Sequence, residues 1–267
     1  MNYKFFDYKY NIEGFGSDLF GTAHLIFIAL SFILVPIVCF LLRKTSHKKI
    51  DVFLKIFAVV ITLLEITKMT WESYYDITTG RGFNFGGILP LYTCSLLIYT
   101  TWFAAYGKGR VKDYSLAYLT TVNLISGGIG IVYCNGLNWY PFWTFGAFYS
   151  LFFHFSMFAI GNFLLFTGYK KLGYKDIFKA WVPMVILAVF AIPANYQYGA
   201  DYMQIYEGSG VPLFDKLAST LADNNLRWVF TEIMLATYIP LAGVAVCTAK
   251  FTYYINGKLK RKAVVET

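Results

Sequence analysis

The chain has 267 residues, of which 57% are hydrophobic, 20% aromatic and only 14% charged. A soluble domain carries about 25% charged residues, so these few charges exclude the polar coat that soluble domains of this length need. The net charge of +8 does not indicate nucleic-acid binding, because the basic residues lie in short clusters between apolar runs. We therefore expect an all-α protein surrounded by membrane lipid, with no nucleic-acid partner.

Seven apolar stretches are long enough to be membrane helices, which need roughly 20 mostly apolar residues. They lie at Gly21–Leu42, Val52–Tyr74, Leu89–Tyr106, Tyr114–Tyr133, Trp143–Thr167, Ile177–Ala194 and Trp228–Phe251. Unpaired backbone groups cannot face hydrocarbon, so each stretch is expected to be a helix unless it packs inside protein. The first is longer than the core of a signal peptide, and we interpret it as a retained span. The sequence thus predicts a polytopic helix bundle.

Lysine and arginine are divided unequally between the two sets of connections. Sixteen of the 23 lie in the loops and ends on one side, and five lie on the other. Because cytoplasmic loops carry the excess of basic residues, we expect the N-terminus outside the cell and the C-terminus in the cytoplasm. This division gives an extracellular segment 1–20, a seven-helix domain 21–251 and a basic cytoplasmic tail 252–267.

The longest extracellular connection is predicted at 195–227. More than 30 residues between two spans is long enough for a lid or a binding loop. A surface loop with a short interfacial helix near Leu213–Leu221 fits the same residues. The sequence leaves these two interpretations open.

Three charged residues share one face of the second span. Glu65, Lys68 and Glu72 have the i, i+3, i+7 spacing of neighbours on a helix. Ionisable groups in lipid are costly and usually face protein or a wet cavity. The three residues therefore predict either an ion pair that holds helices together or a contact with a substrate head group. Glu232 lies at a similar depth in the seventh span and is a candidate partner for Lys68.

Two further residues carry possible chemistry. His154 lies near mid-membrane in the fifth span, one turn after Ser150, where it fits either a hydrogen bond between helices or proton transfer. Cys94 lies in the segment LPLYTCSLL, in which Pro90 is expected to open or kink the third helix. A lone cysteine fits packing, whereas a cysteine beside a histidine can be an activated nucleophile.

The remaining small and sulfur-containing residues favour packing. Ser126 and Gly130 of the fourth span match the small-xxx-small pattern of close helix contacts. The chain has four cysteines without paired spacing and three histidines, so we expect no metal site. No cofactor is expected either.

Four segments carry a resemblance to a known family. LPLYTC, FFHFSM, ANYQYGADYM and the FGTAHL before the first span resemble the YwaF-like family of bacterial integral membrane proteins, from about Phe20 to Phe251. In that family the third-span segment commonly reads PLHLC, so Tyr92 stands where its histidine is usual. The resemblance implies a multi-pass protein of a bacterial plasma membrane.

The YwaF-like family is itself similar to eukaryotic endoplasmic-reticulum proteins regarded as phospholipid acyltransferases. Those proteins work through a cysteine early in the third helix and a histidine in the fifth. The resemblance therefore implies that Cys94 and His154 are catalytic. In the eukaryotic group the cysteine directly follows proline, where this chain has Leu91.

Three functions remain open from the sequence. The first is acyl transfer or hydrolysis on a membrane lipid, with Cys94 as nucleophile, His154 as base, and Tyr92, Asn195 and the polar outer rim at the head group. The second is a transporter or receptor-like binder whose site is lined by the charged residues of the second and seventh spans, namely Glu65, Lys68, Glu72 and Glu232. The third is a structural partner of another membrane protein. The oligomeric state is not predicted.

Overall fold

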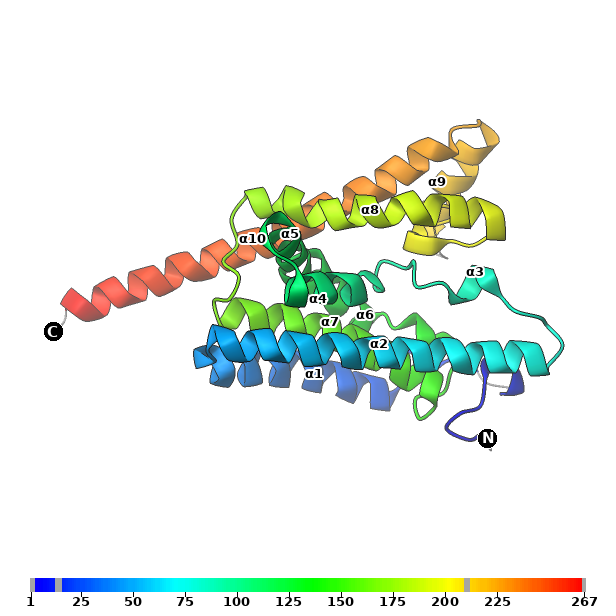
Figure 1. Cartoon of the computed structure of the whole chain (residues 1–267), viewed down its shortest axis with the longest axis horizontal. Helices are drawn as coiled ribbons and strands as arrows, with labels where there is room; N and C mark the ends of the chain where they lie inside the picture. Colours follow the sequence, from blue (N-terminus) through cyan, green and yellow to red (C-terminus); the bar gives the residue numbers. More distant parts are fainter. Residues whose placement is uncertain (1–2, 13–15, 209–211, 266–267) are drawn as a thin grey trace.

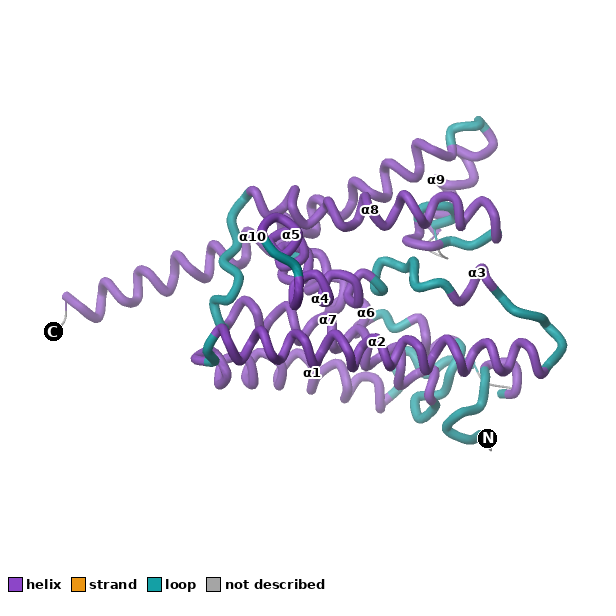
Figure 2. Tube along the Cα trace, in the orientation of Figure 1, coloured by secondary structure: helices purple, strands orange, loops and turns teal. Residues whose placement is uncertain are grey.

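The computed structural model describes residues 3–12, 16–208 and 212–265, and over these ranges the chain is helical, with no strand (Figures 1 and 2). The helices are α1 (Thr22–Leu41), α2 (His47–Thr78), α3 (Phe85–Ile88), α4 (Leu96–Tyr106), α5 (Gly109–Thr120), α6 (Val122–Val132), α7 (Phe145–Phe166), α8 (Lys175–Tyr198), α9 (Pro212–Asp223) and α10 (Arg227–Val265). The predicted all-α class is confirmed.

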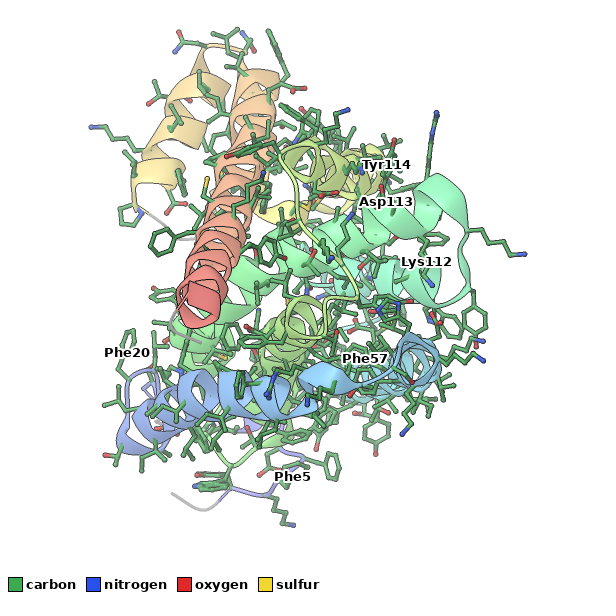
Figure 3. All side chains as sticks on the ribbon, turned by 90° about the vertical axis from the view of Figure 1, so that its left-hand side faces the viewer. Phe5, Phe20, Phe57, Lys112, Asp113 and Tyr114 are labelled. Atoms are coloured by element: carbon green, nitrogen blue, oxygen red, sulfur yellow. The ribbon has the colours of Figure 1, made fainter. Side chains whose placement is uncertain are left out.

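The helices form a layered bundle. In Figure 1, α1, α2 and α7 run along one side, α8, α9 and α10 along the other, and α4 to α6 lie between them. The end-on view in Figure 3 shows the same order, with the α1–α2 pair below and α8 and α10 above. The closest pairs are α6 with α7, α5 with α8, and α2 with α4. The central helices therefore join the two outer layers.

Five described helical stretches are long and apolar enough to cross a membrane by length and composition. They are Thr22–Lys44, Gly109–Asn138, Phe145–Phe166, Lys175–Tyr198 and Arg227–Tyr253. The α2 helix has 32 residues, enough length for a span, but Lys55, Glu65, Lys68 and Glu72 interrupt its apolar run. The total of seven spans and their orientation stay predictions.

The third predicted span is broken rather than continuous. The four-residue α3 ends at Ile88, an irregular segment follows, and α4 begins only at Leu96. Pro90 disfavours helical backbone at the residue before it, and Leu89 is accordingly extended (φ −64°, ψ 136°). The helical prediction over Leu89–Tyr106 is therefore wrong in its first part, where Pro90 opens the chain and places Cys94 just ahead of α4.

The fourth predicted span is bent. Thr121 leaves the helical region (φ −125°, ψ −94°), which separates α5 from α6. Its hydroxyl donates to the Ala117 carbonyl at 2.6 Å, a back-bond that competes with the helix ladder and bends helices. The bend lets α5 pack on α8 while α6 packs on α7.

The predicted long connection 195–227 is largely folded. The α8 helix ends at Gly199, whose positive φ of 60° is the left-handed conformation that glycine adopts readily. A 3-10 turn at Tyr202–Gln204 follows, and then α9 at Pro212–Asp223. The short helix expected near Leu213–Leu221 is confirmed as part of α9. At the other end, α10 continues as a helix to Val265, through most of the predicted tail 252–267.

Candidate functional site

The charged residues of α2 face the inside of the bundle. Glu65 is buried, and Lys68 binds Glu72 with an Nζ–Oε2 distance of 2.6 Å. The pair is an i, i+4 neighbour pair on one helix face. Both side chains keep part of their surface accessible. The predicted shared face is thus confirmed, and Lys68 pairs with Glu72 of its own helix.

Tyr149 of α7 connects this face to the opposite helix. Its hydroxyl donates a hydrogen bond to the Glu65 carboxylate, and the Lys68 ammonium lies 5.8 Å from the centre of its ring. A tyrosine hydroxyl that meets a buried carboxylate satisfies both groups, which limits the desolvation cost of placing a charge in a bundle. Tyr149 therefore holds Glu65 in place between α2 and α7.

Cys94 lies in the turn that leads into α4. Its carbonyl accepts from Leu97 N at 3.0 Å, and the next residue, Ser95, donates its N–H to the Tyr92 carbonyl at 2.9 Å. The thiol is free and half-buried. The N–H groups of Ser95, Leu96 and Leu97 bind the carbonyl groups of Tyr92, Thr93 and Cys94, so backbone hydrogen bonds close this turn.

Cys94 itself packs against the hydrophobic cluster that α2, α4, α5 and α7 form, and polar side chains of four helices are near enough to influence its thiol electrostatically. Glu65 and Lys68 of α2 lie within electrostatic range of the sulfur. So do the hydroxyl groups of three tyrosines, Tyr118 on α5, Tyr149 on α7 and Tyr238 on α10. We call the seven residues Glu65, Lys68, Glu72, Cys94, Tyr118, Tyr149 and Tyr238 the Cys94 cluster.

The irregular segment before α4 is held by hydrogen bonds to this cluster. Tyr118 donates to the Thr93 carbonyl at 2.9 Å, and the Thr93 and Tyr238 hydroxyl groups are 2.9 Å apart. Tyr92 is exposed, and its ring lies edge-on to that of Tyr202 at 4.9 Å. The backbone around Cys94 is therefore fixed from α5, α10 and the α8–α9 connection.

His154 makes its contacts toward α6. Its Nδ1 is 2.8 Å from the Ser150 carbonyl. A carbonyl only accepts, so Nδ1 carries the proton and Nε2 has the free lone pair. The ring packs over Gly130, where an added Cβ would lie 2.0 Å from the histidine Cδ2. Among the described residues no hydrogen bond joins His154 to Cys94.

Two further predicted site residues lie apart from the cluster: Asn195, predicted at the head group, and Glu232, predicted as a partner for Lys68. Asn195 is buried, and its amide binds both backbone groups of Tyr202, donating to the carbonyl at 3.1 Å and accepting from N–H at 2.7 Å. It therefore holds the α8–α9 connection in place. Glu232 is exposed on α10.

The N-terminal segment packs along α2 beyond Lys68. Tyr8 is buried, with its ring stacked on Tyr75 at 5.5 Å and edge-on to Trp71 at 5.2 Å. The Trp71 indole donates to the Phe6 carbonyl at 2.9 Å. These contacts cover the α2 surface on either side of Glu72, at the end of the helix that the sequence places outside.

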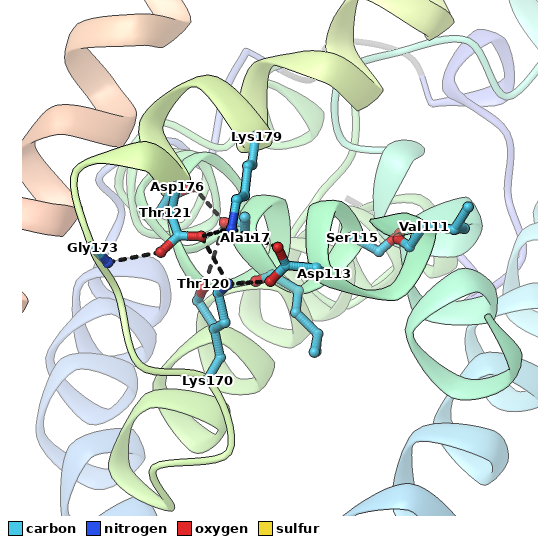
Figure 4. Close-up of polar contacts among 11 residues, drawn as sticks. Val111, Asp113, Ser115, Ala117, Thr120, Thr121, Lys170, Gly173, Asp176 and Lys179 are labelled. Atoms are coloured by element: carbon cyan, nitrogen blue, oxygen red, sulfur yellow. Dashed lines mark hydrogen bonds and ion pairs between the residues drawn. The ribbon is translucent and has the colours of Figure 1, made fainter. Parts of the chain in front are cut away.

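A second group of charges ties α5, α8 and the loop between α7 and α8. Asp113 accepts from Lys170 and Lys179, each at 2.6 Å, and Asp176 accepts from Lys170 at 2.8 Å and from the Gly173 N–H at 2.7 Å (Figure 4). We call these four charged residues the Asp113 ion network. Figure 3 shows Lys112 beside Asp113; it binds Asp51 of α2 at 3.0 Å.

Sequence reasoning missed the three tyrosines of the Cys94 cluster, because the candidates inside the spans were chosen mainly among charged, histidine and cysteine residues. Their positions inside the predicted fourth, fifth and seventh spans, away from the span ends, were the available signal. No described group of three or more His, Cys, Asp or Glu side chains has the arrangement of a metal site.

Comparison with known proteins gives one match. No curated protein and no solved structure is similar to the chain. The family described as the TMEM164 family matches residues 19–245, a range that includes every residue of the Cys94 cluster and His154. Because this match covers most of the sequence, the chain belongs to the TMEM164 family of membrane proteins.

Proposed function

We propose that the chain acts on a membrane lipid by acyl transfer or acyl hydrolysis, with Cys94 as the nucleophile. The observation that carries the proposal is the position of this free, partly buried cysteine in the irregular segment just before α4, next to Thr93, which Tyr118 of α5 and Tyr238 of α10 hold by hydrogen bonds.

The reaction would proceed through a thioester. The Cys94 sulfur attacks the carbonyl carbon of a lipid ester, the carbon–oxygen bond breaks, and the lysolipid leaves as an alcohol with the proton that the thiol gave up. Water or the hydroxyl of a second lysolipid then attacks the thioester, takes the acyl group and returns a proton to sulfur.

His154 is the proposed base. The Ser150 carbonyl holds the proton on Nδ1, which leaves Nε2 as the acceptor, the same tautomer that a general base needs. Its role requires Nε2 to reach the thiol directly or through one water. Lys68, Glu72 and Tyr92 keep accessible surface and are the proposed contacts for a lipid head group.

The test uses the full chain in lipid nanodiscs, with isotope-labelled phospholipid and lysophospholipid as substrates. Cys94→Ala is expected to abolish both lipid turnover and the hydroxylamine-sensitive acyl group on the protein, and His154→Ala to abolish turnover. Cys247→Ala is the matched control, because Cys247 is a free and exposed cysteine of α10 outside the Cys94 cluster. Unchanged turnover in both variants would contradict the proposal.

Substitutions of the same residues also distinguish the proposed enzyme from the rival function. A transporter or small-molecule binder that uses Glu65, Lys68 and Glu72 would lose uptake or ligand binding in Lys68→Met and keep it in Cys94→Ala. That pattern, together with the absence of a thioester on Cys94, would show that the protein binds or transports a small molecule and is not the proposed enzyme.

A further inference from the structure

An apolar groove runs along α2 beside the segment that carries α3. It has a volume of about 430 Å³, within the range of roughly 300–1,000 Å³ that small-molecule pockets occupy. Its walls are mainly apolar. They include Ile66, Met69, Ser73 and Tyr74 of α2, with Phe83 and Ile88 on the other side.

The groove lies next to the charged face of α2. Ile66, Met69 and Ser73 each follow a charged residue of the Cys94 cluster by one position, which is about 100° around the helix axis at 3.6 residues per turn. The apolar wall and the row of charges therefore run side by side for two turns. On the far wall, Ile88 leads directly into the irregular segment that ends at Cys94.

The surroundings favour approach from the bilayer. The N-terminal segment covers α2 at Trp71 and Tyr75, on both sides of Glu72. The groove instead opens on the side of α2 that carries Ile66 and Tyr74, both of which are exposed. A long apolar groove beside polar groups matches a lipid, whose acyl chain is apolar and whose ester and head group are polar.

Building on the proposed function, we propose that this α2–α3 groove binds the acyl chain of a membrane lipid, which enters sideways from the bilayer and places its ester toward the Cys94 cluster. A second apolar groove, lined by Phe32, Leu124, Ile129, Val132 and Phe158, has a similar volume of about 380 Å³. It lies on α6, which carries no charged residue, and it serves as the comparison site.

The test is photo-crosslinking in nanodiscs with phosphatidylcholine that carries a diazirine near the end of one acyl chain. Mass spectrometry of the labelled peptides is expected to place the label on residues 66–74 and 83–88. Met69→Trp fills the groove and is expected to lower this label about tenfold, the factor that 1.4 kcal/mol of binding free energy represents. Ile129→Trp, in the second groove, is the matched control and is expected to leave it unchanged.

Label spread evenly over α1, α6 and α2, or label that Met69→Trp does not lower, would overturn the inference. Ser73→Leu is a milder second variant that keeps the test valid if Met69→Trp does not fold. Crosslinking needs no turnover, so it is repeated in Cys94→Ala. If the label is localised but Cys94→Ala keeps full turnover, the proposed function is wrong and the groove inference stands. If Cys94 forms a thioester but the label is not localised, the groove inference is wrong and the proposed function stands.

Discussion

At the α5–α8 end of the bundle two aspartates meet two lysines, whereas the Cys94 cluster holds two glutamates, one lysine and a free thiol. In the Asp113 ion network, each carboxylate contacts both Lys170 and Lys179. The charges balance and the network closes on itself. In the Cys94 cluster, Lys68 is bound to Glu72 alone and the formal charge is negative.

The comparison shows that acidic and basic side chains can stabilise the bundle at one place and form a candidate binding site at another. A balanced network of short ion pairs joins helices and leaves no capacity for a ligand, because each new contact would have to break an existing one. The Lys68–Glu72 pair instead keeps part of both side chains accessible, so a zwitterionic lipid head group can meet both charges. The Asp113 network is therefore structural, and the Cys94 cluster is the better candidate for chemistry.

The largest effect on stability is expected from Lys170→Met. This substitution leaves Asp113 and Asp176 with Lys179 as their one cation, and Asp176 is buried. Breaking a buried ion pair by removing one partner costs about 3–5 kcal/mol of unfolding free energy. Denaturant titration in micelles measures the loss. Lys171→Met is the control, because Lys171 is exposed and should change little. Equal stability of both variants would show that the network does not hold the helices.

A smaller effect, on activity rather than stability, is expected from Lys68→Met. Loss of a charged contact with the lipid head group costs about 1.5–3 kcal/mol, or roughly 10–100-fold in kcat/KM. Lys55→Met, on the same helix but exposed, is the control and should keep full turnover. If Lys68→Met unfolds the protein and retains kcat/KM per folded molecule, Lys68 is structural in the same way as Lys170.

Two glycines of α6 are expected to differ in the same respect, Gly127 affecting stability and Gly130 affecting activity. A Cβ at Gly127 would meet the backbone N of Phe158 at 2.6 Å, whereas a Cβ at Gly130 would meet the ring of His154. Backbone cannot give way, so Gly127→Ala should cost about 1–3 kcal/mol of stability, as overpacking does. Gly130→Ala should instead displace the His154 ring and lower kcat. Thermal unfolding and turnover of both variants would show whether Gly130 is only a packing position.

Features of the fold and of the Cys94 cluster were predictable where they depend on local sequence, and not where they depend on which helices pack together. The α2 charge row was predictable, because i, i+3, i+7 spacing alone sets a common helix face. The break before α4 was foreseeable from Pro90, and the short helix α9 fitted one of two open interpretations. Helical periodicity does not say which helices become neighbours, however. The contacts of Tyr149 with Glu65 and of Tyr118 with Thr93 depend on the packing of α5 and α7, so they were not predicted.

The predicted roles of Asn195 and Gly130 also show that a sequence does not reveal which residues become neighbours. Asn195 was assigned to the head group, but its amide binds the backbone of Tyr202 in a turn that the sequence did not reveal. Gly130 was assigned to close helix packing, and packing is what the structure shows, but its neighbour is the side chain of His154. A single sequence gives the type of residue at a position and not the identity of its partner.

The smallest effect is expected where charge pairing is exposed, at Asp51, which precedes the predicted second span. A hydrogen bond from Tyr169 lowers the pKa of this carboxyl below its usual 3.8, and Lys112 adds to the shift, but the side chain is 40% exposed. A lowered pKa means that the stabilisation is present above pH 3.8 and is lost as the pH falls through the folded-state pKa. Because solvent screens an exposed pair, Asp51→Asn should cost only about 0.2–1 kcal/mol at pH 7. The cost should shrink in high salt and disappear in acid. Unfolding titrations at pH 7 and in acid, at two salt concentrations, measure it; a cost as large as that of Lys170→Met would mean that charge balance, rather than burial, decides which ion pairs hold this bundle together.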